Sequence, residues 1–200
     1  MRPSRGRCAP GALLLALATL APAASPPPSA AGDPLDELMR QLAAQPHGHV
    51  AFTEVQYLAM LDRPLESSGE LLYEAPDRLE KHTLKPRPET LTLAHGMLSA
   101  TRGGRTRTVE LAAHPQLAPL IEGLRATLAG DRAALEQFFD TRLEGDLAHW
   151  TLRLTPRNAE MARVVKEVRV SGEHAKLTTV EVLQSDGDRS LLTIGPELPP

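Results

Sequence analysis

The chain has 200 residues, of which 22 are basic and 25 acidic, so its formal net charge at pH 7 is −3. A mildly acidic chain is a poor match for nucleic acid, whose binders are usually basic. Aromatic residues make up only 3%, which is sparse for a site that stacks sugars or bases on aromatic rings. The length fits one ordinary domain once an export segment is set aside.

The N-terminus has the pattern of a cleavable export signal. Arginines at positions 2, 5 and 7 precede an apolar run over residues 11–20, and Ala21-Pro22-Ala23 follows as an A-x-A cleavage site. The apolar run is too short to cross a bilayer as a helix. We therefore expect residues 1–24 to be a signal peptide that is cut near Ala23 or Ala24, and the mature chain to be soluble and outside the cytoplasm.

Cysteine usage supports export without a lipid anchor. Cys8 is the only cysteine, and it precedes the apolar run. A lipoprotein signal would place its cysteine just after that run. After cleavage no cysteine remains for disulfides, thiol catalysis or metal ligation.

The mature chain is predicted to begin with a tether and a helix. Residues 25–32 are rich in proline, alanine and serine, which is typical of a flexible tether. One domain is expected over residues 33–195, followed by a C-terminal tail over residues 196–200. Asp33-Pro34 has the N-cap and first-turn chemistry of a helix start, and we expect the helix to end at His47-Gly48-His49. Its apolar stripe is Leu35, Leu38, Met39 and Leu42.

From Val50 onward the apolar spacing changes to a period of two, which is typical of β-strands. Short strands in succession, joined by tight turns, form an antiparallel meander. The predicted strands cover residues 50–58, 65–73, 78–84, 90–93, 97–101, 105–111, 147–154, 164–171, 177–184 and 189–194.

Helical spacing returns between Pro115 and Phe139, which predicts two helices separated at Gly130, with Asp131 capping the second. The expected fold is therefore α+β: about ten strands in a curved antiparallel sheet, with an N-terminal helix and a two-helix insertion. An open sheet of this size tends to curl. The amphipathic helices are the candidates to cover its concave face.

Several motifs resemble those of the LolA family of periplasmic lipoprotein carriers. Phe52-Thr53-Glu54 is similar to the family's F-x-Q on the first strand, and Ser68-Gly69-Glu70-Leu71 to its approach to the next strand. The segment Tyr73-Glu74-Ala75-Pro76-Asp77-Arg78-Leu79 resembles an R-P-x-x-F turn, and residues 186–190 resemble a late D-x-x-G-N-x-T hairpin. The resemblance covers residues 35–194. It implies that the curved sheet is an unclosed half-barrel with a helical lid over an acyl-binding cavity.

The resemblance also implies a function. The chain would be a carrier or chaperone that binds acyl chains of a lipoprotein, or another acyl lipid, for transport to the outer membrane. It would be located in the periplasm, and its partners would be an inner-membrane donor complex and an outer-membrane acceptor. We expect a monomer without catalytic activity, cofactor or metal, with residues 116–128 as the lid. The predicted lipid-binding residues are Phe52, Leu71, Tyr73, Leu79, Leu117, Leu120, Ile121, Leu124, Trp150 and Leu152.

Two departures from the family pattern concern the turn after the second strand. Members often have an arginine just before the turn proline, implicated in lid closure and ligand release, where this chain has Ala75; Arg78 lies three residues later. Leu79 replaces a Phe-type residue.

The apolar stripe of the predicted lid helix also has a simpler explanation, since such a stripe is more commonly ordinary core. The alternative is therefore a non-catalytic envelope-assembly module with a packed core and no cargo cavity.

Three other features have simpler explanations than a chemical site. His47 and His49 lack a nearby His or Cys that would complete a metal site. Asp186-Gly187 is a tight-hairpin signal rather than a calcium loop. Gly103-Gly104 lies between arginines, but no helix follows to bind a phosphate at its N-terminus. A secreted hydrolase would need a convergent nucleophile and base, which the sequence does not indicate.

Overall fold

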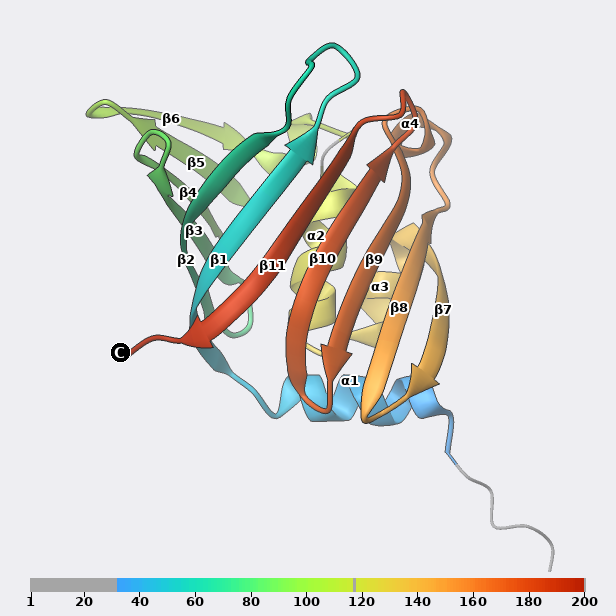
Figure 1. Ribbon diagram of the computed structural model, residues 1–200. Helices are drawn as coiled ribbons and strands as arrows, with labels where there is room; N and C mark the ends of the chain where they lie inside the picture. The colour runs from blue at the N-terminus through green and yellow to red at the C-terminus, as the bar shows by residue number, and fades with distance from the viewer. Residues whose placement is uncertain (1–31, 117, 200) are drawn as a thin grey trace, which may run out of the picture. The chain divides into compact units, whose positions relative to one another are not determined.

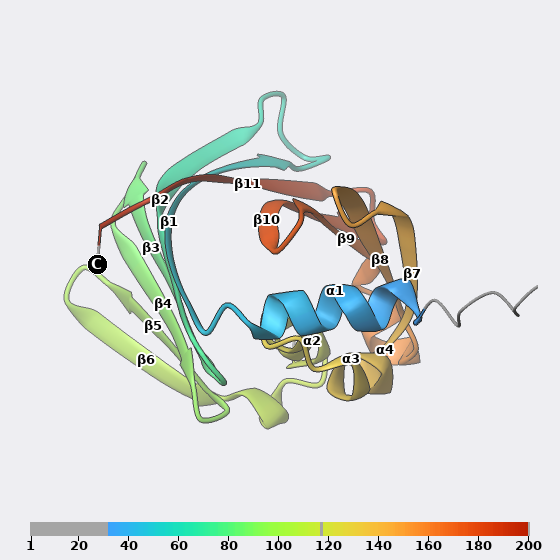
Figure 2. The same ribbon diagram turned by 90° about the horizontal axis from the view of Figure 1, so that it is seen from below.

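The computed structural model describes residues 32–116 and 118–199. Within these ranges the chain forms one curved antiparallel sheet of eleven strands, with its helices on the concave side (Figures 1 and 2). The helices are α1 (Pro34–Ala43), the 3-10 helix η1 (Leu111–Ala113), α2 (Ala118–Leu128), α3 (Arg132–Phe138) and α4 (Ala159–Ala162). The strands are β1 (His47–Tyr57), β2 (Leu65–Glu74), β3 (Arg78–Lys85), β4 (Glu89–Ala94), β5 (Met97–Arg102), β6 (Arg105–Glu110), β7 (Phe139–Asp146), β8 (His149–Pro156), β9 (Val165–Glu173), β10 (Lys176–Gln184) and β11 (Arg189–Glu197).

The strand order is β6-β5-β4-β3-β2-β1-β11-β10-β9-β8-β7. Strands that neighbour each other in this order are consecutive along the chain, except that β1 pairs with β11, with Phe52 opposite Ile194. The sheet therefore consists of two meanders joined by the first and last strands. Its edges are β6 and β7, and the sheet is unclosed, as predicted.

The structure corrects the prediction between the second inserted helix and Leu147. Helix α3 ends at Phe138, and Phe139 has extended backbone angles (φ −132°, ψ 144°) and begins β7. The sheet therefore has eleven strands rather than about ten. The alternation of β7 is weak because it is an edge strand that carries few apolar residues, and Phe139 also continues the helical stripe. The short helix α4 was not predicted either.

Several element ends also differ from the prediction. Strand β1 begins at His47, which pairs with Glu74, so the histidine segment belongs to the sheet rather than to the end of the helix. Strand β11 continues past residue 195 to Glu197, which pairs with Val50. The predicted signal peptide, and the tether as far as residue 31, lie outside the described residues.

Helix α1 begins at Pro34, directly after its N-cap residue Asp33, as the sequence predicts. The Asp33 side chain accepts a hydrogen bond from the Leu35 backbone N–H at 3.0 Å, which satisfies one of the free donors of the first turn. Arg132 at the start of α3 donates to Asp33 at 2.5 Å and to Asp36 at 2.8 Å. These ion pairs join α1 to α3. The buried side chains of α1 are Leu35, Leu38, Met39 and Leu42.

The main hydrophobic core lies in the half of the sheet formed by β7 to β10. The helices contact one another and β7, β8 and β9 most extensively. Gly130 lets the α2–α3 turn approach α1 closely, because a Cβ there would lie 2.1 Å from the Met39 carbonyl oxygen. The core cluster contains Leu35, Leu38, Met39, Leu42, Ala126, Leu135, Phe139, Trp150, Leu152, Leu154, Met161, Val165, Val168 and Val170.

Candidate functional site

The pairing register shows which side chains of the first meander face the helices. Leu152, fully buried in the core, is opposite Val170, which is opposite Val180. Val180 is opposite Leu192, and Leu192 is opposite Glu54 on β1. Because directly opposed residues share a face, Glu54 and the residues two positions away from it point to the concave side.

The same register brings four of the predicted binding residues together on this concave face. Phe52 lies two residues before Glu54, and Leu71 is opposite Val50 on one side and Lys81 on the other. Tyr73 is opposite Leu79. Phe52, Leu71, Tyr73 and Leu79 therefore form a contiguous apolar surface across β1, β2 and β3, which we call the β1–β3 inner face.

Burial differs between the two halves of the concave side. In the core half, Leu152 is 0% exposed and Trp150 is 2% exposed. On the β1–β3 inner face, Phe52 is buried, whereas Leu71, Tyr73 and Leu79 are only partly buried. The helices therefore cover the β7–β10 half well and leave part of the other half accessible.

Trp150 and Leu152 are separated from the other predicted sheet residues. Both belong to the core cluster under the helices, and the Trp150 indole Nε1 donates to the His174 carbonyl oxygen at 2.9 Å. Because both side chains are almost completely buried in the core cluster, we assign them to the core and not to the β1–β3 inner face.

Helix α2 packs on the core half. Leu120 and Leu124 contact the core cluster, and Ile121 is partly buried. Gly123 allows a close approach, since a Cβ there would lie 2.3 Å from the ring of Phe139. The predicted lid residue Leu117 lies outside the described residues.

A polar cluster that the sequence analysis missed lies on the β1–β3 inner face. The Lys81 ammonium on β3 donates to Glu54 Oε2 at 2.5 Å, and it lies 5.0 Å from the centroid of the Phe52 ring. Ser190 and Ser67 donate to the two oxygens of Glu54 at 2.7 and 3.2 Å. The sequence signal that could have indicated this cluster was the period-two pattern of β1 and β3, because Glu54 and Lys81 are charged at positions where that pattern predicts apolar residues.

Glu54 is ionised in this setting. Only 8% of the residue is exposed, and burial by itself would raise the pKa of its carboxyl. The hydrogen bond and charge of Lys81 and the hydrogen bond from Ser190 outweigh burial and hold that pKa below its ordinary value. The cluster is therefore an ion pair within a largely apolar surface.

An arginine does reach the turn between β2 and β3, but it comes from α2. Arg125 donates from Nη1 to the Pro76 carbonyl oxygen at 3.3 Å and pairs with Glu122 at 2.6 Å. Arg78 instead pairs with Glu80 on its own strand. Close to this contact, the buried Tyr73 hydroxyl has no hydrogen-bond partner among the described residues, and burial raises its pKa.

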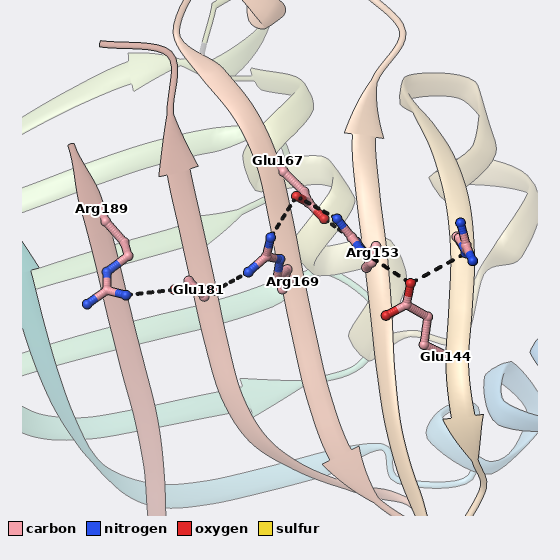
Figure 3. Close-up of polar contacts among 7 residues, drawn as sticks. Glu144, Arg153, Glu167, Arg169, Glu181 and Arg189 are labelled. Carbon is pink, nitrogen blue, oxygen red and sulfur yellow. Dashed lines mark hydrogen bonds and ion pairs between the residues drawn. The ribbon is translucent and has the colours of Figure 1, made fainter. Parts of the chain in front are cut away.

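The convex face of β7 to β11 carries a chain of ion pairs (Figure 3). Arginine and glutamate alternate across all five strands, with separations of 3.1–3.4 Å at the contacts of Arg169 and Glu181. A depression of about 420 Å³ lies over these strands. Because its charged side chains already pair with one another, it offers little to a ligand. The chain consists of Arg142, Glu144, Arg153, Glu167, Arg169, Glu181 and Arg189.

A second depression, beside β8 and β9, is lined by the predicted binding residue Trp150, but neither depression is lined by Leu71, Leu79 or Leu120. Residues 32–116 and 118–199 contain no group of three His, Cys, Asp or Glu side chains suited to a metal. His49 instead contacts Glu70 at 3.1 Å and the Pro199 carbonyl oxygen at 2.8 Å. Among the helices described, none combines the length and apolar composition needed to span a membrane.

Comparisons with known proteins identify one family. The sequence model of the family described as "Outer membrane lipoprotein carrier protein LolA-like" matches residues 24–195. No curated protein matches the sequence.

Several solved structures are similar in shape. A LolA superfamily protein from Nitrosomonas europaea is 11% identical, with a TM-score of 0.44 and coverage of 84% of this chain and 96% of that one. A chain of the MucA/MucB complex from Pseudomonas aeruginosa is 13% identical, with a TM-score of 0.46; the match covers 82% of this chain and 56% of that one. A putative outer membrane lipoprotein-sorting protein domain from Vibrio parahaemolyticus is 9% identical, with a TM-score of 0.44 and coverage of 82% and 91%.

Proposed function

The chain belongs to the LolA-like family of outer membrane lipoprotein carrier proteins, and from this membership we propose that it is a periplasmic carrier or chaperone for acyl-bearing cargo. The cargo is the acyl chains of a lipoprotein or of another lipid, bound on the β1–β3 inner face. The observation that carries the proposal is the contrast in burial. Leu71 and Leu79 face the helices but are only partly covered, whereas Leu152 in the other half is fully buried.

The energetics of acyl chains explain why such a surface suits a carrier. Each methylene in water costs about 0.8 kcal/mol, so cargo must be shielded during transfer and still be released. An apolar sheet face beside a helix meets both needs, because the helix can move without breaking a strand pair. In this proposal α2 rests on the core half when the protein is empty, and Leu120, Ile121 and Leu124 contact the acyl chains when cargo is bound.

The remaining parts of the proposal follow from the same role. Capture, shielding and release involve no covalent step, so the protein is not an enzyme and needs no cofactor. An inner-membrane donor would load it, and an outer-membrane acceptor would take the cargo. Export of the chain by the signal over residues 1–24 would place it between the two membranes.

Two neighbouring leucines on β2 provide a matched test. Leu71 points to the concave side, whereas Leu72, opposite His49 and Glu80, points to the convex side. We expect Leu71→Asn to weaken binding of a pyrene-labelled decyl chain at least tenfold, because an amide on the acyl-binding surface would displace apolar contact. Leu72→Asn should leave the affinity within about twofold, since substitutions remote from a binding surface rarely change it. Fluorescence titration of the purified mature protein measures both affinities.

The competing function is an envelope-assembly module, which is favoured because neither of the two depressions described above is lined by Leu71, Leu79 or Leu120. That function predicts that the wild-type protein binds no pyrene-labelled chain and that it contains no acyl lipid when purified from its own periplasm. Equal weakening by both asparagine substitutions would also contradict the proposed site, because it would indicate a general loss of structure.

A further inference from the structure

Lys81 occupies an unusual position for a charged residue. It lies on the concave side, between Leu71 on β2 and Leu91 on β4 as its direct cross-strand neighbours. Its side chain crosses β2 to reach Glu54 on β1. A charge placed in an apolar surface is costly unless it is paired. The pairing with Glu54 explains how the structure tolerates Lys81 at this position, but it does not explain why a lysine lies there instead of an apolar residue.

The hydrogen-bonding capacity of the pair is unevenly used. Glu54 accepts from Lys81, Ser67 and Ser190, and only 8% of the residue is exposed. A lysine ammonium has three donors, and in the described chain one of them goes to Glu54. The Lys81 side chain keeps 24% of its surface exposed, so donors remain available to a molecule lying on this face.

The charge balance of the pair selects the kind of ligand group. Lys81 and Glu54 together are neutral, and the carboxylate of Glu54 lies 2.5 Å from the ammonium. An anionic head group approaching Lys81 would meet that carboxylate as well, and the like charges would repel. An uncharged acceptor, such as the carbonyl oxygen of an ester or amide, gains the hydrogen bond without the repulsion.

We propose that Lys81, held in place by Glu54, is the polar anchor of the acyl-binding surface and donates a hydrogen bond to the carbonyl oxygen of an acyl ester or amide. The hydrocarbon chain beyond that carbonyl lies along Leu71, Leu79 and Leu91. This inference rests on the proposed function, and it adds a recognised chemical group: the carbonyl that joins an acyl chain to its carrier molecule.

Three probes of equal chain length test the anchor in the wild-type protein. They are a pyrene-labelled decane, the same chain ending in an N-methyl amide, and the same chain ending in a free carboxylate. A hydrogen bond to a charged group predicts that the amide binds about tenfold more tightly than the hydrocarbon. The carboxylate should bind more weakly than the amide at pH 7.

A double substitution removes the anchor without leaving an unpaired buried charge. Lys81→Met with Glu54→Gln replaces both charges by uncharged side chains of similar size, and we expect the amide and hydrocarbon probes to bind this variant equally. The matched control is Lys176→Met with Glu197→Gln, which removes an exposed lysine–glutamate pair with a 2.7 Å separation, formed by the first residue of β10 and the last residue of β11. The control should retain the preference for the amide.

The outcomes separate this inference from the proposed function. If the hydrocarbon binds wild-type protein as tightly as the amide does, the anchor is refuted and acyl binding stands. If the carboxylate binds most tightly, the choice of an uncharged carbonyl is refuted. If none of the three probes binds, the proposed function itself fails. These comparisons use wild-type protein, so they hold even if the double variant does not fold.

Discussion

The unequal covering of the two sheet halves predicts unequal costs of removing leucine side chains. Leu152 is 0% exposed within the core cluster, so Leu152→Ala removes three buried carbons and leaves a cavity. Burial alone accounts for roughly 2.4 kcal/mol at 0.8 kcal/mol per methylene, and the cavity raises the total to about 3 kcal/mol. Leu79 is only partly buried. Leu79→Ala should cost about 1 kcal/mol, because part of the side chain already contacts water and no closed cavity forms.

Urea unfolding measures this difference with a reporter already present. Trp150 is the only tryptophan, and its 2% exposure in the core predicts a large change in fluorescence on unfolding. Both variants and the wild type are followed by the same signal, with far-UV circular dichroism as a second measure of unfolding. Comparable slopes against urea would show that each variant unfolds in the same cooperative transition.

Equal destabilisation by the two substitutions would refute the reasoning. It would mean that the surface around Leu79 is packed as tightly as the core around Leu152. The β1–β3 inner face would then be ordinary core, and the structural argument for cargo binding there would be lost.

Two further predictions concern the helices and the ionised carboxyls. Gly130→Ala should lower the free energy of unfolding by at least about 2 kcal/mol, because φ is +65° and a Cβ would clash with the Met39 carbonyl. Gly103→Ala is the control: φ is +57° but the space around the residue is open, so the substitution should cost about 1 kcal/mol. Equal costs for the two variants in urea unfolding would contradict the predicted clash at Gly130. Acid should also destabilise the protein. The folded-state pKa values of Glu54 and Glu167 lie below the ordinary value of 4.5. Between the folded-state and the ordinary pKa values the unfolded chain therefore binds more protons than the folded protein. The stabilisation that these two carboxylates provide is fully present above about pH 4.5 and is lost as the pH falls through their folded-state pKa values. Urea midpoints measured between about pH 6 and 3 should fall, and fall less when Glu54 and Lys81 are replaced by Gln and Met.

The Arg125 contact shows that an arginine can reach this turn from a distant part of the chain. The sequence analysis looked for an arginine next to the turn proline and found Ala75 there. In the structure, Arg125 of α2 donates to the carbonyl of Pro76 from the other side. The two residues are 49 positions apart, so no local motif could have indicated the contact.

Local patterns were sufficient wherever neighbouring residues determine the structure. The Asp33 cap and the stripe of α1, the period-two strands and the glycine between α2 and α3 all act over a few residues, and each led to an element that the structure contains. The same reasoning failed at Phe139. There a helical stripe and a weakly alternating edge strand overlap, and pairing with β8 decides between them.

The sequence by itself determined the class of fold, a curved antiparallel sheet with an inserted pair of helices, because periodicity, caps and turns are local properties; the unclosed half-barrel was implied by the family resemblance. Only the tertiary structure decided which apolar residues are core and which are accessible. Trp150 and Leu79 have the same kind of sequence pattern, and they differ because the helices pack on one half of the sheet. It also placed Lys81 against Glu54, 27 residues away, since that contact depends on the register of three paired strands.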